Sequence, residues 1–354
     1  MTRPAIRPQP RDLHLTTAHP LQVCWDLQLG GLGADALHLA LAHGLFDHLQ
    51  QFKAAAQLAQ TLDWHAESAD YFLELLWSLD LLERDAQRPV RYRNRPLADR
   101  HLRSGAAQYC GDALMFRHRV LRETGAQLDD YLRNGMPRRS PTTAQLDQGW
   151  ANAARLQIAQ EQRAVTCDSA CALLASLPEY PRLQRLLDLG GGPGLVAIAL
   201  ARQLPALSGV VFEYPETARV AADNIGAAGL GARLSACGAD LDTDDIGSGY
   251  DLIWCSSVLH FVHDLPATLQ RLHAALAPGG LLVCCQAEVP QARHVATQVL
   301  PYYLHMRLQG RHVLAEGELA DLLRNSGWRG VEQIDGVRYP LTPVTAVIAR
   351  KAKE

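Results

Sequence analysis

The sequence has little of several features that mark specialised classes of protein. No run approaches the ~18 consecutive apolar residues that a membrane-spanning helix requires. Aromatic residues make up only 6% of the chain, and neither charge dominates, since 34 Lys and Arg face 37 Asp and Glu. A nucleic-acid-binding surface usually needs a clustered positive stripe, which this sequence lacks. We therefore expect neither a membrane nor a nucleic acid among its partners.

Cysteine pairs are also missing. The eight cysteines are scattered along 354 residues and include no C-x-x-C motif, which in a chain of this size indicates reduced thiols rather than a disulfide framework. Residues 1–22 are rich in proline and arginine, and they lack the apolar core of a secretory signal. These features predict a flexible N-terminal lead and a cytoplasmic protein.

The first half of the chain is predominantly helical in pattern. Residues 21–50, 53–64 and 67–82 carry apolar side chains at helical spacing, and the polar residues 83–95 fit a small β-hairpin. Three short helices followed by a hairpin describe a winged-helix module. The first helix is so apolar over residues 27–49 that one face needs covering by a partner chain. Residues 102–163 continue the helical pattern, with breaks near Gly135 and Pro141.

The pattern changes near residues 165–182, after which short buried strands alternate with helices. The expected strands are 185–189, 209–213, 233–238, 250–255, 281–285, 330–336 and 344–350, and the expected helices are 195–203, 217–228, 265–276 and 316–326. This alternation predicts an α/β fold with a Rossmann-like, mostly parallel sheet covered by helices on both faces.

A glycine-rich turn follows the first of these strands. Gly190, Gly192 and Gly194 allow a tight turn and close backbone approach at a helix N-terminus. Leu195 stands after them, so the spacing differs from the dinucleotide pattern G-x-G-x-x-G. Two acids, Glu213 and Asp240, follow later strand patterns, and each alone is equally well a solvated loop residue. Together with the turn, they favour a nucleoside-type cofactor that offers ribose hydroxyls and an adenine amino group.

Five segments in this order resemble one known family. They are Leu186-Leu-Asp-Leu-Gly-Gly-Gly-Pro-Gly194, Phe212-Glu-Tyr-Pro215, Gly238-Ala-Asp-Leu241, Val258-Leu-His260 and Leu276-Ala-Pro-Gly-Gly280. They are similar to class I S-adenosylmethionine-dependent methyltransferases, within which they resemble the small-molecule O-methyltransferases of the caffeate and hydroxyindole type and their bacterial secondary-metabolism relatives. Residues 36–49 and 73–84 resemble that family's winged-helix dimerisation domain.

The resemblance implies a domain order and a set of ligands. We expect a winged-helix-like dimerisation domain over residues 23–100, a helical linker and substrate-capping region over 101–182, and an S-adenosylmethionine-binding catalytic domain over 183–354. The cofactor would be S-adenosyl-L-methionine, converted to S-adenosyl-L-homocysteine, with no metal. The partners would be a small-molecule acceptor and a second copy of the chain.

The resemblance also assigns cofactor contacts. Gly190 and Gly192 would lie against the methionine part, Glu213 with its neighbour Tyr214 at the ribose, and Asp240 and Leu241 at the adenine. Ser256 occupies a place near the cofactor where many relatives have a lysine.

Methyl transfer to a hydroxyl requires removal of its proton, and a histidine with a pKa near ~6.5 suits this role. His260 follows a strand at the carboxyl side of the sheet, and the resemblance implies that it is the general base. His263 makes an H-x-x-H pair with it, but without a clear third ligand we expect no metal.

The surroundings of His260 depart from the family. Phe261 and Val262 follow it where relatives have Asp and Trp. Gln286 and His312 stand where relatives place two acids beside the base, so an imidazolium at His260 would be less stabilised. These changes leave three readings open: a more acidic acceptor, a nitrogen or carbon nucleophile, or catalysis largely by proximity.

Candidate acceptor contacts come from the middle helices and the segment before His312. They are Met115, Phe116, Trp150, Tyr302 and Met306, although such residues at helical spacing are also typical of a core. Tyr302 and Tyr303 face different directions on a helix, so at most one lines a pocket.

These observations predict a homodimeric methyltransferase that acts on a small, aromatic or heteroaromatic acceptor at oxygen. One alternative keeps the cofactor but methylates nitrogen or carbon, or performs a non-methylating reaction. Two others are a nicotinamide-dependent oxidoreductase, disfavoured by the missing third glycine, and a winged-helix regulator of DNA, disfavoured by the near-neutral charge.

Overall fold

The computed structural model describes residues 19–85, 87–135 and 142–353. Most of the lead expected over residues 1–22 and the helix break expected at Pro141 lie outside the described residues. The chain divides into two compact units, Met1–Asp99 and Arg100–Glu354, and each is considered by itself. Among the described helices, none is both long and apolar enough to cross a membrane.

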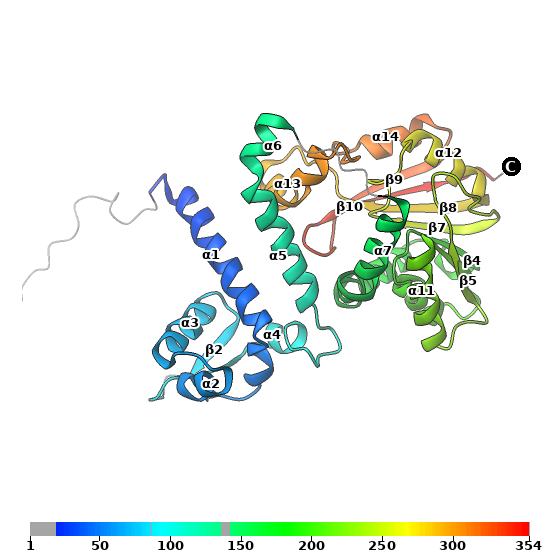
Figure 1. Cartoon of the computed structure of the whole chain (residues 1–354). Coiled ribbons are helices and arrows are strands. Elements are labelled where there is room, and N and C mark those ends of the chain that lie inside the picture. Colours follow the sequence, from blue (N-terminus) through cyan, green and yellow to red (C-terminus); the bar gives the residue numbers. More distant parts are fainter. Residues whose placement is uncertain (1–18, 86, 136–141, 354) are drawn as a thin grey trace, which may run out of the picture. The chain divides into compact units, whose positions relative to one another are not determined.

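The first unit has the helices and hairpin of a winged-helix module (Figure 1). Its elements are α1 (Gln22–Ala42), η2 (Leu45–His48), β1 (Lys53–Ala54), α2 (Ala55–Leu62), α3 (Ala66–Ser78), β2 (Leu82–Asp85) and β3 (Arg91–Asn94), after which α4 (Pro96–His101) leads into the second unit. The three strands form an antiparallel sheet in the order β1-β3-β2. The buried Asn94 donates from Nδ2 to the carbonyl of Phe46 at 2.7 Å, which ties β3 to η2.

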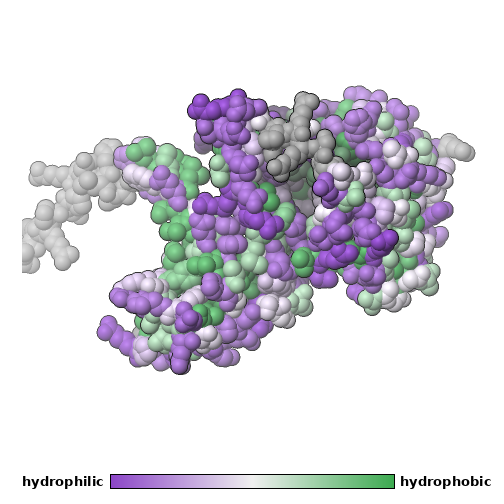
Figure 2. All heavy atoms as spheres, viewed as in Figure 1, coloured by the Kyte–Doolittle hydropathy of each residue, from purple (hydrophilic) through white to green (hydrophobic). Residues whose placement is uncertain are grey.

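Helix α1 leaves several large apolar side chains in solvent. Leu27 is 76% exposed, and the others at this helix are Leu21, Val23, Trp25, Leu29, Leu32 and Leu39. Figure 2 shows hydrophobic residues gathered along this helix. These side chains lie on more than one side of the helix, and so large an exposed apolar surface is typical of an interface with another chain.

The second unit is built on a seven-stranded sheet in the order β6-β5-β4-β7-β8-β10-β9 (Figure 1). The strands are β4 (Arg185–Leu189), β5 (Ser208–Glu213), β6 (Leu234–Gly238), β7 (Tyr250–Ser256), β8 (Leu276–Gln286), β9 (Arg329–Val337) and β10 (Val344–Arg350). Neighbouring strands from β6 to β8 pair in parallel, whereas β10 pairs antiparallel with both β8 and β9. The predicted α/β fold, with its mostly parallel sheet, is confirmed.

Helices cover both faces of this sheet because successive side chains of each strand point to opposite sides. One apolar cluster joins the sheet to α9 (Cys167–Ala175), α10 (Leu195–Gln203), α11 (Pro215–Ala227) and α13 (Arg293–Leu308). A second cluster joins the opposite face to α12 (Leu265–Ala275) and α14 (Glu318–Asn325). Strands that are buried on both faces explain the continuous apolar runs of the sequence.

A further group of helices precedes the sheet. They are α5 (Gly111–Ala126), α6 (Leu128–Asn134) and α7 (Thr143–Ala153), then a continuous helical run through η3 (Ala154–Ile158), α8 (Ala159–Glu161) and η4 (Gln162–Thr166), with the short η5 (Tyr180–Arg182) before the sheet. Both η3 and η4 are π-helical turns, in which each backbone hydrogen bond spans one more residue than in an α-helix.

One boundary differs from the prediction. The sequence indicates a turn at residues 278–280 before a strand at 281–285, but β8 begins at Leu276 and contains those residues as an irregularity. Gly279 adopts φ +75°, and the pairing register with β7 shifts between Tyr250 and Leu252. The glycines therefore act as a bulge inside the strand rather than as a turn before it.

Candidate active site

The glycine-rich turn joins β4 to α10 at the carboxyl edge of the sheet, and it has no room for side chains. Gly190 and Gly192 adopt φ +60° and +59°. A Cβ atom at Gly190 would lie 2.3 Å from Cγ2 of Val258, and one at Gly191 would lie 2.6 Å from Cγ of Asp188. Only glycine is compatible with both this backbone conformation and this proximity.

Glu213, the last residue of β5, reaches back to this turn. Its carboxylate accepts hydrogen bonds from the backbone N–H of Gly192 at 3.0 Å and of Tyr214 at 3.1 Å. The pKa of Glu213 is raised to about 7. Burial is the main cause, the Asp147 carboxylate adds to it, and the two N–H donors oppose it. A carboxylate has about four acceptor positions, so oxygen lone pairs remain for two further donors.

The loop after β6 lies beside Glu213. The backbone N–H of Ala239 donates to the carbonyl of Glu213 at 2.8 Å, which brings Asp240 to the end of the neighbouring strand. Asp240 accepts from the N–H of Asp242 at 2.9 Å, and Arg271 donates to the carbonyls of Leu241 and Asp244. The structure thus brings together Gly190, Gly192, Glu213, Tyr214, Asp240 and Leu241, the residues assigned to one cofactor by resemblance.

Ser256 ends β7 on the other side of the turn. It is half-buried, and the nearby hydroxyl of Tyr339 is buried without a hydrogen-bond partner among the described residues. The next residue, Ser257, adopts φ +57°, and its N–H donates to the carbonyl of Cys285 at 2.8 Å. This left-handed residue directs the chain from β7 toward Val258 and His260.

His260 is buried and is held by the backbone of His312. Its Nδ1 lies 2.5 Å from the carbonyl oxygen of His312, and the N–H of His312 donates to the carbonyl of His260 at 3.2 Å. A carbonyl only accepts, so Nδ1 carries the proton and the lone pair resides on Nε2. Among the described residues, Nε2 has no hydrogen-bond partner. Burial lowers the pKa of His260. The hydrogen bond to the His312 carbonyl opposes this decrease, and the His312 imidazole adds to it.

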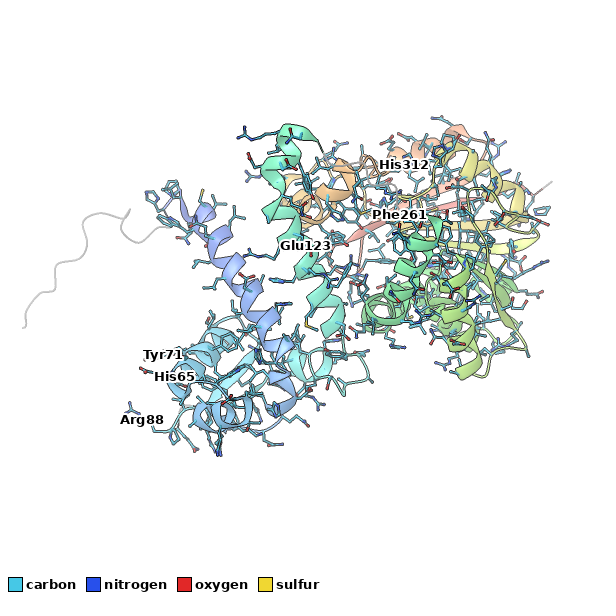
Figure 3. All side chains as sticks on the ribbon, viewed as in Figure 1. His65, Tyr71, Arg88, Glu123, Phe261 and His312 are labelled. Atoms are coloured by element: carbon cyan, nitrogen blue, oxygen red, sulfur yellow. The ribbon has the colours of Figure 1, made fainter. Side chains whose placement is uncertain are left out.

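Aromatic side chains surround His260. The rings of Tyr303 and Phe261 lie 5.4 and 6.3 Å from its ring centroid, and Trp150 packs edge-on against Phe261 at 5.0 Å. Figure 3 labels Phe261, which follows His260 in the chain, and His312, whose backbone carbonyl holds the His260 ring. This environment is apolar and excludes water from Nε2.

Gln286 lies at the end of β8 and is buried, and neither Oε1 nor Nε2 of its side chain has a hydrogen-bond partner among the described residues. The nearby Glu288 has a different role, because it accepts from the N–H groups of Gly317 and Leu319 at the start of α14. The hydrogen bond to Nδ1 of His260 therefore comes from the backbone carbonyl of His312 and not from a carboxylate.

The acceptor contacts expected from sequence fall into separate environments. Trp150 reaches Phe261, and Met306 is buried in the core beside the sheet. Tyr302 packs against the guanidinium of Arg117 at 4.7 Å, so the tyrosine beside His260 is Tyr303. On α5, Met115 and Phe116 are half-buried, and Phe116 lies under Arg119.

Sequence reasoning missed Gln162, which contacts the glycine-rich turn. Its Nε2 donates to the carbonyl of Gly191 at 3.1 Å, and its Oε1 accepts from the N–H of Leu195 at 3.2 Å. The one available signal was a run of polar residues inside an apolar helical segment. Among the described residues, no group of three or more His, Cys, Asp or Glu side chains is arranged to hold a metal ion.

Together, the fold and this site define an α/β enzyme with a nucleoside-type cofactor at the carboxyl edge of its sheet. Comparison with known protein families shows which kind of α/β enzyme this is. Residues 159–333 match the family model of a methyltransferase domain, and residues 25–104 match that of an O-methyltransferase dimerisation domain.

Similar proteins agree with these matches. The chain is 31% identical over 241 residues to 3-hydroxy-5-methyl-1-naphthoate 3-O-methyltransferase of Streptomyces sahachiroi, covering 66% of this chain and 67% of that one. It is 30% identical over 289 residues to the N,N-dimethyltransferase OxyT of Streptomyces rimosus, covering 78% and 81%. Human N-acetylserotonin methyltransferase has the same fold, with a TM-score of 0.78 at 20% identity over 95% of this chain and 99% of that one.

The chain belongs to the family of S-adenosylmethionine-dependent small-molecule O-methyltransferases. It is therefore a methyltransferase that uses S-adenosylmethionine, and the oxidoreductase and DNA-regulator alternatives are not retained. The dimerisation-domain match and the exposed apolar face of α1 agree with a chain that assembles with a partner.

Proposed function

We propose that this enzyme transfers the methyl group of S-adenosylmethionine to a hydroxyl oxygen of a small aromatic or heteroaromatic acceptor, with His260 as the general base. One observation carries the proposal: Nδ1 of His260 is fixed as a donor to the His312 carbonyl, so a lone pair on a buried Nε2 is free to take a proton. The related naphthoate enzyme, named for 3-O-methylation, supports an aromatic hydroxyl as the acceptor.

The glycine-rich turn fits the proposed cofactor. A cradle without room for a Cβ atom at Gly190 and a carboxylate with spare acceptor positions at Glu213 suit a nucleoside. Glu213 would accept from the ribose hydroxyls, and Asp240 with Leu241 would flank the adenine. Gly190 and Gly192 would lie against the methionine part, with Tyr214 and Ser256 beside the cofactor. When bound, S-adenosylmethionine supplies a methyl group on a positively charged sulfur that leaves readily.

The residues around His260 contribute the remaining steps. Nε2 accepts the hydroxyl proton of the acceptor, while the His312 carbonyl keeps the ring oriented and Nδ1 protonated. Phe261, Tyr303 and Trp150 keep water away from Nε2. The lowered pKa of His260 makes it a weak base, which suits an acidic, phenol-like hydroxyl.

The acceptor contacts stay part of the proposal. Met115, Phe116, Trp150, Tyr302 and Met306 are the sequence-derived candidates, and of the pair Tyr302 and Tyr303 the place beside His260 favours Tyr303. Gln286 would act as a neutral polar group near the base.

The proposal includes a homodimer formed through α1 and a cytoplasmic location. The eight unpaired cysteines support the cytoplasmic location.

A nitrogen acceptor is the second candidate. The absence of a carboxylate on Nδ1 and the 30% identity to an N,N-dimethyltransferase favour it, because a neutral amine needs no base before it attacks. A panel of hydroxynaphthoates, catechols and aminonaphthalenes, incubated with S-adenosylmethionine, separates the two. Products methylated at oxygen, located by NMR, support the proposal, whereas methylation only at nitrogen replaces it with the second candidate.

A further inference from the structure

Three consecutive polar residues, Gln160, Glu161 and Gln162, are buried at the junction between α8 and η4. They are 8%, 8% and 7% exposed, respectively. We call them the QEQ segment. Buried amides and carboxylates destabilise a fold unless hydrogen bonds satisfy them, so the partners of this segment indicate its role.

The first two residues bind α5. Gln160 accepts from the N–H of Ala113 at 3.1 Å and donates to Oδ2 of Asp112 at 2.6 Å. Glu161 accepts two hydrogen bonds from Arg117, at 2.9 Å from Nε and 2.8 Å from Nη2. This bidentate pair is largely buried, and such geometry fixes both position and orientation.

The third residue binds the glycine-rich turn on the other side. Gln162 bridges the Gly191 carbonyl and the Leu195 N–H, and thereby spans the turn from its middle to the start of α10. Ile158, one turn earlier, lies 3.3 Å from where a Cβ atom of Gly192 would be. The same helical run therefore contacts the turn at two points.

The π-helical turns explain how adjacent residues serve two elements. Gln160 and Glu161 lie in α8 between the two π-helical turns, Gln162 is the first residue of η4, and π-helical turns occur often at functional sites. Successive side chains of a helix point in different directions, so Gln160 and Glu161 reach α5 while Gln162 reaches the turn. Every polar group of the segment that is named above has a partner, which makes the connection rigid.

We infer that the QEQ segment couples the cofactor site to α5, the helix that carries Met115 and Phe116. Gln162 is a positioning residue that holds the glycine-rich turn in its cofactor-binding shape, and the Glu161–Arg117 pair transmits order in that turn to α5. A ligand that orders the turn then lowers the entropic cost of ordering α5 for an acceptor. This inference rests on the proposed cofactor site.

Hydrogen exchange measured by mass spectrometry on the full-length protein, with and without saturating S-adenosylhomocysteine, tests the coupling. In the wild-type protein we expect slower exchange in the turn and also in peptides from residues 111–126. Arg117→Gln removes the Glu161–Arg117 pair, to which the inference assigns the coupling, but leaves Gln162 and the bonds of Gln160 to Asp112 and Ala113 intact. It should bind S-adenosylhomocysteine within about twofold of wild type and lose the protection in α5.

Four further variants examine Gln162, the Glu161–Arg117 pair and a control position. Gln162→Leu should weaken S-adenosylhomocysteine binding roughly tenfold, as expected for two neutral hydrogen bonds, and should abolish protection of α5 at saturation. Gln162→Glu, which keeps an acceptor for the Leu195 N–H but places a carboxylate oxygen against the Gly191 carbonyl, serves if the leucine variant does not fold. The double variant Arg117→Glu with Glu161→Arg should restore protection of α5. Arg133→Gln, which removes an exposed ion pair on α6, is the matched control and should behave as wild type.

Three results overturn the inference. If S-adenosylhomocysteine binds the wild-type protein but leaves exchange of α5 unchanged, or if Arg117→Gln keeps full protection, the coupling is absent while the proposed cofactor site stands. If calorimetry detects no binding of S-adenosylhomocysteine to the wild-type protein, the proposed cofactor site fails, and the inference fails with it.

Discussion

His260 and His312 are joined through a reciprocal pair of hydrogen bonds, from Nδ1 of His260 to the His312 carbonyl and from the His312 N–H to the His260 carbonyl. The backbone of His312, rather than its imidazole, therefore orients the proposed base. A carbonyl supports the imidazolium less than a carboxylate would, because it carries no full charge. His260 is thus held in position without being made strongly basic.

The His312 imidazole affects His260 through charge, and this predicts a pH shift. The pKa of His260 lies below 6.5, so kcat/KM for the acceptor, measured at saturating S-adenosylmethionine, should be constant above that pH and fall as His260 becomes protonated at lower pH. His312→Ala keeps the backbone carbonyl and removes the second imidazole, so the acid limb should move to higher pH with kcat at pH 8 within about tenfold of wild type. An acid limb that stays in place or moves to lower pH would contradict this account.

Glu213 makes cofactor affinity depend on pH. Its pKa is about 7 in the free protein, and donated hydrogen bonds from ribose hydroxyls favour the ionised form. Binding should therefore release a proton near neutral pH, and affinity should rise with pH through this range and level off above it. Calorimetry of S-adenosylhomocysteine in buffers of different ionisation enthalpy measures the proton directly. Glu213→Gln should bind more weakly and without proton release, and an unchanged proton count in this variant would exclude Glu213 as its source.

Two glycine substitutions separate close packing from ordinary helix preference. Gly190→Ala forces a Cβ atom to within 2.3 Å of Val258 at φ +60°, so both stability and S-adenosylhomocysteine binding should fall. Adding Val258→Ala should recover part of that loss. The control, Gly226→Ala, lies in α11 with nothing within 4 Å of the new Cβ atom, and should raise stability by about 0.5–1 kcal/mol. Thermal unfolding measures all three, and equal effects at the two glycines would refute the packing argument.

The exposed apolar surface of α1 predicts a dimer that can be separated. Leu27 and Leu32 are 76% and 59% exposed on different sides of the helix, so replacing both with Glu leaves the core of the first unit intact but places charges on this surface. Light scattering coupled to size exclusion should find a dimer for wild type and a monomer for the double variant. Leu97→Glu, at a 56% exposed position outside α1, is the control. A double variant that remains dimeric would place the interface elsewhere.

The elements with strong periodicity could be predicted from sequence, while contacts between distant segments could not. The strand before Gly190 and the helix after Gly194 follow from a buried apolar run and a glycine-rich turn. The bulge at Gly279 was misread as a turn, because glycines produce both and the choice depends on the pairing with β7. Sequence also cannot distinguish a backbone from a side-chain role, so the contact of the His312 carbonyl with His260 could not be predicted.

The same limit applies to the proposed acceptor site. Tyr302 and Tyr303 are adjacent, and which of them faces His260 depends on how α13 packs on the sheet. Gln162 shows no motif, since its importance comes from a turn that lies 29 residues further along the chain.

The most direct test of the central claim compares wild type with His260→Asn on one acidic phenolic acceptor. Methyl transfer is followed at saturating S-adenosylmethionine, after calorimetry has matched S-adenosylhomocysteine binding in the two proteins. If His260 is the base, wild type methylates the hydroxyl and the variant is slower by about 10²–10⁴-fold, with unchanged cofactor affinity. Equal rates in the two proteins would contradict the account and leave proximity alone as the source of catalysis.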